Sequence, residues 1–207
     1  MSTTPATEPA RDNSLRHVVT SVIYTVVTVI ALGLIYPLLI WALATLLFHH
    51  QAEGSLIVSG GKVVGSELVG QVFTKPQYFH GRPSAAGKGY DPTQTGGTNL
   101  GPTSKKLIDS TKSTIAALKK ENPDATGPVP MDLVTSSASG IDPDISPAGA
   151  YYQAARVAKA RGTSLDVVRA QIAAHTTQRQ LGILGEPRVN VLELNRALDA
   201  QGADHRP

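Results

Sequence analysis

The chain has 207 residues, a formal net charge of +3 and no cysteine. This length suffices for one domain of ordinary size and an additional segment. The positive charge is modest and scattered, with neither a basic stripe nor interleaved aromatic residues, which gives no support to nucleic-acid binding.

The N-terminal region predicts a short tail followed by a membrane anchor. Residues 1–15 are expected to form a disordered cytoplasmic tail, because this stretch is polar and rich in Ser, Thr and Pro. From Val18 to Phe48, 31 consecutive residues include no Asp, Glu, Lys, Arg or His. A spanning helix needs about 20 such residues, and 31 would extend roughly 46 Å. The apolar region of a cleaved signal peptide is only about 7–15 residues long. Residues 16–49 therefore predict an uncleaved transmembrane signal-anchor helix.

The flanks of this span predict its orientation. Arg11 and Arg16 precede it, whereas the first basic residue after it, with histidine taken as neutral, is Lys62. By the positive-inside rule, the N-terminus is expected to lie in the cytoplasm and the bulk of the chain outside. Residues 50–207 are thus expected to form an extracytoplasmic domain, which without disulfides must be held by its own core.

Within the span, Ser21, Thr25 and Thr28 share one helical face. Small hydroxyl residues allow close approach and hydrogen bonding between membrane helices, so this face is a candidate contact with another subunit. The alternative is that the hydroxyl groups bond to the backbone of their own helix. Pro37 is expected to kink the helix, since it removes one backbone hydrogen bond.

The first half of the domain predicts short extended segments, a long loop and a helix. Extended segments are expected at residues 55–58, 60–66 and 67–73. Residues 74–103 are rich in Gly, Pro, Asn and Thr, and a loop of that length is commonly functional. A helix is predicted over 104–121, with Leu107, Ile108, Ile115 and Leu118 on its buried side. Residues 129–137 resemble a buried strand.

Helix signals dominate the second half. Ser146 as the capping residue and Pro147 at the first helical position predict a helix that ends at Gly162. A second helix is expected to begin at Thr163 and Asp166, and a third at Asn190 and Glu193, closing at Gly202. The expected fold is one N-terminal transmembrane helix followed by a single mixed α/β (α+β) domain.

The segment "HGRPSAAGKGY", residues 80–90, nearly matches a phosphate-binding P-loop. Five residues, rather than four, separate Gly81 from Gly87, and Gly89 follows Lys88 where a P-loop has Ser or Thr. The spacing matters because the loop aims successive N–H groups at one phosphate cluster. We therefore expect no nucleotide here, and interpret the segment as a rigidly turned contact loop.

Two other groups of residues raise the question of catalysis or metal binding. Ser136, Ser137 and Ser139 cluster in "TSSASG", and one of them with Lys105 or Lys106 would form a Ser-Lys dyad, but no serine-hydrolase motif accompanies them. Serines beside glycine are more often turn residues.

The aspartates Asp132, Asp142 and Asp144 lack the regular spacing of a calcium loop. We predict no catalytic, cofactor-binding or metal-binding residues, and keep a membrane-anchored serine/lysine hydrolase or a ligand-sensing domain as alternatives.

Six segments together resemble the C subunit of the Kdp-type potassium-transporting ATPase, the KdpC family. The resemblance, to a family of bacterial and archaeal cell membranes, extends over the N-terminal membrane helix and almost the entire following domain, and only Thr98 and Ala138 stand where Ser and Gly are expected. The segments are "GSELVGQVF" (65–73), "YFHGRPSA" (78–85), "GGTNLGPTS" (96–104), "VPMDLVTSSASGIDPDISPAGA" (129–150), "YQAARVAKARG" (152–162) and "LGILGEPRVNVLELNRALD" (181–199).

The resemblance implies a non-catalytic subunit of a high-affinity ATP-driven potassium importer in the cell membrane. The implied partners are a channel-like potassium-binding subunit, a P-type ATP-hydrolysing subunit and a small membrane peptide. The complex uses ATP, Mg and K, while the C subunit assembles and stabilises it and raises the ATP affinity of the hydrolysing subunit. Candidate polar contacts, either internal or across an interface, are Arg82, Asn99, Asp142 and Arg156.

Overall fold

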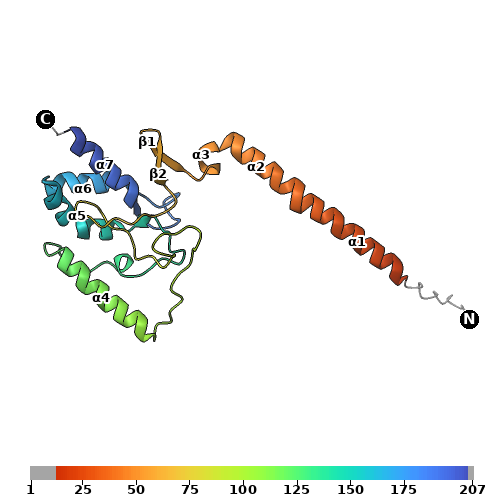
Figure 1. Ribbon diagram of the computed structural model, residues 1–207, viewed down its shortest axis with the longest axis horizontal. Helices are drawn as coiled ribbons and strands as arrows, with labels where there is room; N and C mark the ends of the chain where they lie inside the picture. The colour runs from red at the N-terminus through yellow and green to blue at the C-terminus, as the bar shows by residue number, and fades with distance from the viewer. Residues whose placement is uncertain (1–12, 205–207) are drawn as a thin grey trace, which may run out of the picture. The chain divides into compact units, whose positions relative to one another are not determined.

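The computed structural model describes residues 13–204, and the chain divides into two units after Glu53 (Figure 1). Most of the predicted tail, residues 1–12, lies outside the described part. The first unit is dominated by one long helix and the second is a mixed helix-and-sheet domain, as the sequence predicted.

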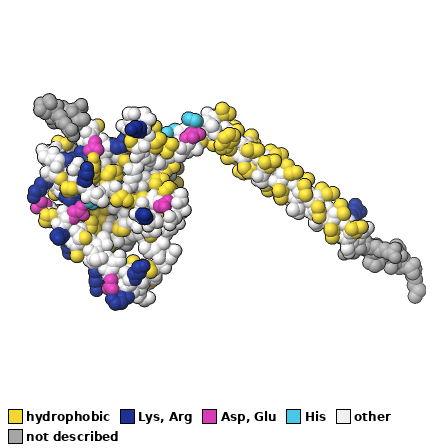
Figure 2. Space-filling model, in the orientation of Figure 1, with side chains coloured by type: hydrophobic (Ala, Val, Ile, Leu, Met, Phe, Trp, Pro, Cys, Tyr) yellow, Lys and Arg dark blue, Asp and Glu magenta, His cyan; other side chains and the backbone are white. Residues whose placement is uncertain are grey.

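The first unit contains one helix that is long and apolar enough to cross a membrane, Ser14–Leu47. Its parts are α1 (Ser14–Ile30), a π-helical segment (Ala31–Ile35) and α2 (Tyr36–Leu47), followed by the short α3 (His49–Ala52). Apolar side chains cover the helix on the face shown in Figure 2 and none is buried. A helix that is apolar all round needs an apolar environment such as lipid.

The π-helical segment lies directly before Pro37. Proline has no N–H group, so Pro37 cannot donate a hydrogen bond to the preceding turn. The N–H of Tyr36 donates to the carbonyl of Ala31, five residues back, which is the π-helical spacing. The helix thus loses its regular hydrogen-bond register beside Pro37, where the sequence predicted an irregularity.

The second unit begins with an antiparallel hairpin of β1 (Leu56–Ser59) and β2 (Lys62–Ser66). Gly60 and Gly61 form its turn with φ values of 56° and 75°, which glycine adopts without steric cost. The predicted extended segment at 67–73 forms no strand, and only an isolated bridge pairs Val69 with Ser66. The hydroxyl of Ser66 accepts a hydrogen bond from the N–H of Leu68, and the resulting turn directs the chain out of the hairpin.

A three-stranded antiparallel sheet lies within the helical part of this unit, in the order β3-β5-β4. The strands are β3 (Asp144–Ile145), β4 (Thr176–Thr177) and β5 (Arg188–Asn190). Val189 on the central strand is fully buried. The helices α5 (Pro147–Arg161), α6 (Leu165–Ala174) and α7 (Val191–Asp204) supply most of the core around it, including Val157, Ile172 and Leu194.

Local capping fixes the ends of these helices. The Ser146 hydroxyl accepts from the N–H of Gly149, Pro147 opens α5, and Gly162 closes it in the left-handed conformation, as predicted. Helix α6 is capped by Ser164 rather than Thr163, one residue later than expected. Asn190 accepts from the N–H of Glu193 at the start of α7, but the predicted end at Gly202 is wrong because the helix continues to Asp204.

Helix α4 (Lys105–Glu121) begins after the capping residue Ser104, one residue later than predicted, and contains no buried residue. Leu107, Ile115 and Leu118 are only half-buried and Ile108 is exposed, so the expected buried side is incompletely covered. The predicted strand at 129–137 is also wrong. Pro130 instead leads into a short 3₁₀ turn (Met131–Leu133). The predicted loop at 74–103 is confirmed, since it contains neither helix nor strand.

Candidate functional site

Two buried amide side chains hold the long loop on the body of the second unit. The Asn195 amide accepts from the N–H of Phe79 at 2.8 Å and donates to its carbonyl at 3.0 Å. The Gln153 amide does the same for His80, at 2.9 and 3.0 Å. Both amides are 1% exposed. Each amide thereby makes the two hydrogen bonds that a neighbouring strand would make with one loop residue, and so satisfies the backbone N–H and carbonyl of that residue.

Arg156, a predicted contact residue, is buried inside the same region. Its guanidinium donates to the carbonyls of Pro76 and Tyr78 and to the side chains of Asn122 and Gln153, at distances from 2.6 to 2.9 Å. Burial lowers the pKa of Arg156, and the nearby Glu121 partly offsets this effect. Its polar contacts are internal, so Arg156 links the loop to α4 and α5.

His80 lies between an acidic group and a carbonyl oxygen. Its Nδ1 is 3.0 Å from a carboxylate oxygen of Glu121, and its Nε2 is 3.2 Å from the carbonyl of Lys75. Burial lowers the pKa of His80 below its ordinary value, and Arg156 adds to the effect while Glu121 opposes it. His80 therefore connects the loop to the C-terminal end of α4 in a pH-sensitive environment.

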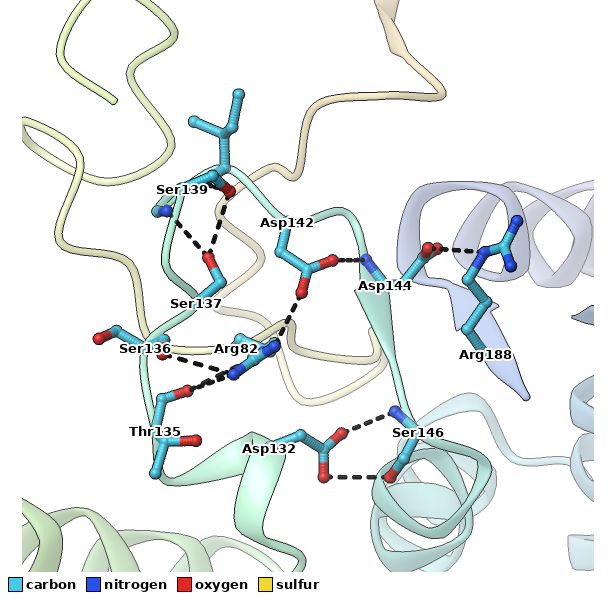
Figure 3. A network of polar contacts seen from close by, with 12 residues as sticks. Arg82, Asp132, Thr135, Ser136, Ser137, Ser139, Asp142, Asp144, Ser146 and Arg188 are labelled. Atoms are coloured by element: carbon cyan, nitrogen blue, oxygen red, sulfur yellow. Dashed lines mark hydrogen bonds and ion pairs between the residues drawn. The ribbon is translucent and has the colours of Figure 1, made fainter. Parts of the chain in front are cut away.

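A second network fixes the next part of the loop (Figure 3). The Arg82 guanidinium donates to Asp142 at 2.8 Å and approaches the carbonyls of Thr135 and Ser136 at 3.4 Å. Asp142 also accepts from the N–H of Asp144 at 3.0 Å. Two predicted contact residues, Arg82 and Asp142, are thus brought together, and they cross-link three segments of the second unit.

The near-P-loop segment uses its backbone amides internally. The Ser84 hydroxyl donates to the carbonyl of Gly140 at 2.6 Å and accepts from the N–H groups of Ala86 and Tyr90. The N–H of Gly89 donates to the carbonyl of Ala86. The Tyr90 hydroxyl donates to the carbonyl of Arg82, and burial raises the pKa of Tyr90 to about 12. These N–H groups point into the loop itself rather than at a common anion position.

The serine cluster has turn geometry. The Ser137 hydroxyl accepts from the N–H of Gly140 at 2.9 Å, and that of Ser139 accepts from the N–H of Ile141 at 3.2 Å (Figure 3). Lys105 and Lys106 are exposed at the start of α4, where Lys105 pairs with Asp109. Both hydroxyl groups thus support the local turn, and no contact joins either lysine to these serines among residues 13–204.

Each of the three aspartates is engaged in hydrogen bonds or ion pairs (Figure 3). Asp132 accepts from the N–H of Ser146 at 2.6 Å and from its hydroxyl at 3.0 Å, which supports the start of α5. Asp144 pairs with Arg188 at 3.0 Å. Burial raises the pKa of Asp144, although Arg188 acts in the opposite direction. Within residues 13–204, no group of three or more metal-ligating side chains is arranged around one point.

The remaining predicted contact residues are not members of these networks. Asn99 is exposed on the loop with a φ of 52°, a left-handed conformation that asparagine tolerates better than most residues. Ser21 and Thr25 are exposed on α1, and Thr28 is partly covered. Their role in subunit contact stays a prediction.

Sequence reasoning missed the central amides Gln153 and Asn195. One signal was available, since each is a polar residue at a helical position that otherwise faces the core, in "YYQAARV" and "LELNRAL". Such a residue must find a hydrogen-bond partner on folding. The partners could not be read from the sequence, because Phe79 and His80 lie 116 and 73 residues away along the chain.

Comparison with known proteins matches nearly the whole chain to one family. The family model described as "K+-transporting ATPase, c chain" matches residues 18–200. The potassium-transporting ATPase KdpC subunit of Koribacter versatilis is 54% identical over 185 residues, covering 89% of this chain and 94% of its own length. The corresponding subunit of Acidobacterium capsulatum is 55% identical, with 89% and 98% covered. That of Myxococcus xanthus is 56% identical over 175 residues, with 84% and 83% covered.

Proposed function

Because the chain belongs to the KdpC family, the C chains of K+-transporting ATPases, we propose that it is the accessory subunit that assembles and stabilises such a complex. The observation that carries this proposal is the extent of the match. Residues 18–200 include both the apolar span and the folded domain, so the relationship covers the architecture and not only one motif.

A non-catalytic role is supported by how the polar groups are used. The hydroxyls of Ser137 and Ser139, the three aspartates and the amides of Ala86, Gly89 and Tyr90 are engaged in local hydrogen bonds or ion pairs. A catalytic constellation instead keeps a nucleophile, a base and charge-stabilising donors directed at a reacting atom. The alternatives of a serine/lysine hydrolase or a free-standing sensor are not supported, given the family assignment.

The proposed partners are a channel-like potassium-binding subunit, a P-type ATP-hydrolysing subunit and a small membrane peptide. The span would contact them through the face that carries Ser21, Thr25 and Thr28. ATP, Mg and K would be bound by those partners. Any increase in ATP affinity would then be transmitted through subunit contacts, since the amides of Ala86, Gly89 and Tyr90 are occupied internally.

We further propose that the N-terminus is cytoplasmic and the second unit extracytoplasmic. Arg11 and Arg16 before the span support this orientation through the positive-inside rule. A cysteine introduced as Gln201→Cys should react with a membrane-impermeant thiol reagent in intact spheroplasts, because the native chain has no cysteine to compete. Labelling that occurs only after lysis would reverse the orientation.

Affinity purification tests the proposed function. With a tag placed after Pro207 and extraction in mild detergent, the chain should retain a P-type ATPase subunit and a multi-helix potassium-binding subunit. A chain whose residues 1–53 are replaced by an unrelated membrane anchor serves as the control, since it should lose the contacts made by the span. Recovery of the intact chain without any other membrane protein would contradict an accessory role.

A further inference from the structure

A small apolar turn projects from the second unit between β4 and β5. We call it the apolar turn and define it as Leu181–Leu184. Leu181 is 89% exposed, Ile183 75% and Leu184 54%, and Leu181 is the most exposed of the large hydrophobic residues that the structure describes. The turn is therefore not part of the core of this unit.

Local hydrogen bonds and one ion pair hold the backbone of the apolar turn. Gln180 and Leu184 exchange two backbone hydrogen bonds of 2.9 Å, and inside them the N–H of Ile183 donates to the carbonyl of Gln180. Gly182 and Gly185 have φ values of 77° and 75°. An ion pair between Arg179 and Glu186 closes the base. Local hydrogen bonds thus hold the backbone of the turn before any partner arrives, which lowers the entropic cost of ordering it on binding.

Two features of the apolar turn are unfavourable for the isolated chain. Leu181 has a φ of 52°, in the left-handed region, which costs a residue with a bulky side chain about 1 kcal/mol or more. Its side chain then gains almost nothing from burial, because it is exposed. Glycine or asparagine would fit this position better. The fold of this chain explains neither the left-handed backbone nor the exposed side chain of Leu181. A binding partner that covers this side chain would explain both.

The surroundings of the apolar turn favour a protein partner over lipid. Residues 178–187 contain no lysine and no aromatic residue, and their one arginine is paired with Glu186. The basic and aromatic side chains that hold a segment at a membrane surface are therefore missing from this segment. An apolar centre with a charged pair at its edge matches the core and rim of a protein interface.

The size of the apolar turn argues against a second copy of this chain as partner. Three aliphatic side chains fall well short of the roughly 800 Å² that each partner buries in a stable interface. A small anchor is sufficient, however, where the two proteins are already held together elsewhere, because tethering raises the effective concentration. The membrane span would supply that tether to another subunit of the same complex.

We propose that Leu181 and Ile183 insert into an apolar socket on another subunit of the potassium-transporting complex. This inference rests on the proposed function and adds the element through which the second unit docks. Arg179 and Glu186 form the polar rim of the contact. The partner is a protein surface with an apolar pocket for the two aliphatic side chains. Polar groups at the edge of this pocket would face the Arg179–Glu186 ion pair, which carries no net charge.

Site-specific photo-cross-linking in the assembled complex tests the contact directly. Benzoylphenylalanine replaces Ile183 in the full-length chain, and in a control it replaces Met131, which is 71% exposed on a different segment. Irradiation should join residue 183 to another subunit of the complex in much higher yield than residue 131. Cross-links to lipid or to a second copy of this chain, or equal yields from both positions, would overturn the inference.

A pair of double variants provides the second readout. Leu181→Ser with Ile183→Ser should reduce the recovery of the other subunits about tenfold, the scale of an interface anchor. The matched control, Met131→Ser with Val167→Ser, removes two other exposed apolar side chains and should leave recovery unchanged. If the wild type recovers its partners and the Leu181/Ile183 variant recovers them equally well, only this inference fails. If the wild type recovers none, the proposed function fails too.

A single substitution separates docking from folding. Leu181→Asn relieves the backbone strain, so the unfolding temperature of the full-length chain in detergent should stay the same or rise, while recovery of the partners falls. A clear drop in unfolding temperature would show that Leu181 serves the fold of this chain, and would overturn its role as an anchor.

Discussion

Asn195 is predicted to be among the most sensitive positions for stability outside the hydrophobic core. Its amide makes two hydrogen bonds with the backbone of Phe79, at 2.8 and 3.0 Å, in a site where Asn195 is 1% and Phe79 0% exposed. In Asn195→Ala, one buried N–H and one buried carbonyl lose their partner. Leaving each such group unsatisfied costs about 1–3 kcal/mol, so the variant should lose roughly 2–6 kcal/mol of unfolding free energy.

This loss should appear as a fall in the unfolding temperature. For a domain of this size, 1 kcal/mol corresponds to about 2–4 °C, which gives a decrease of roughly 4–24 °C. Near-ultraviolet circular dichroism of the full-length chain in detergent measures this unfolding temperature. The signal of the second unit comes from tyrosines such as Tyr78 and Tyr152, and no tyrosine of the membrane helix is buried.

Gln178→Ala provides the matched control, since it truncates an exposed amide at the surface. It should change the unfolding free energy by less than about 0.5 kcal/mol. If Asn195→Ala behaves like this control, the amide clamp does not hold the loop and the description of the site is wrong.

Three further predictions concern the loop and the span. Burial lowers the pKa of His80, so the unfolded chain takes up a proton before the folded chain does as the pH falls. The contribution of His80 to stability is therefore complete above about pH 6.5 and decreases below it. The unfolding temperature of His80→Gln should fall less between pH 7.5 and 5.5 than that of the wild type. Arg82→Ala and Asp142→Ala should each cost about 1–3 kcal/mol, and the double variant less than their sum, because they remove the same contact. Thr25→Leu with Thr28→Leu should weaken co-purification of the partners without changing the unfolding of the second unit.

Each of these predictions has its own contradicting result. An unchanged acid response in His80→Gln would show that other groups set the pH dependence, and His175→Asn serves as the histidine control. Strict additivity in the Arg82 and Asp142 cycle would mean that the two side chains do not stabilise each other. Undiminished recovery after the threonine substitutions would remove the hydroxyl face from the list of subunit contacts.

Features set by neighbouring residues were predictable from the sequence. The span, the Ser146 cap, the left-handed Gly162 and the long loop all depend on the local sequence. Capping and turn chemistry act over this range, and the structure shows them close to where the sequence indicated.

Features set by distant contacts were not predictable. The apolar residues of 67–73 and 129–137 suggested strands, but turns at Ser66 and Pro130 and contacts with other segments override that preference. The actual strands β3 to β5 contain two or three residues each, too few for a periodic pattern to appear.

The networks that hold the loop also depend on contacts between residues that are distant in the sequence. Arg82 and Asp142 were both selected from the sequence, but their direct pairing across 60 positions could not be seen there. Arg156 was expected to make a polar contact, internal or across an interface. The structure shows internal contacts, because its partners at Pro76 and Tyr78 come from a loop about 80 residues away.

The central claim is that this chain supports a potassium-transporting ATPase without performing the chemistry itself. Potassium-stimulated ATP hydrolysis, measured on the purified complex with and without this chain, tests it most directly. We expect no hydrolysis by the chain alone, loss of stimulated hydrolysis when the complex lacks it, and recovery when the full-length chain is added back. Hydrolysis by the isolated chain, or full activity of a complex that lacks it, would contradict the account.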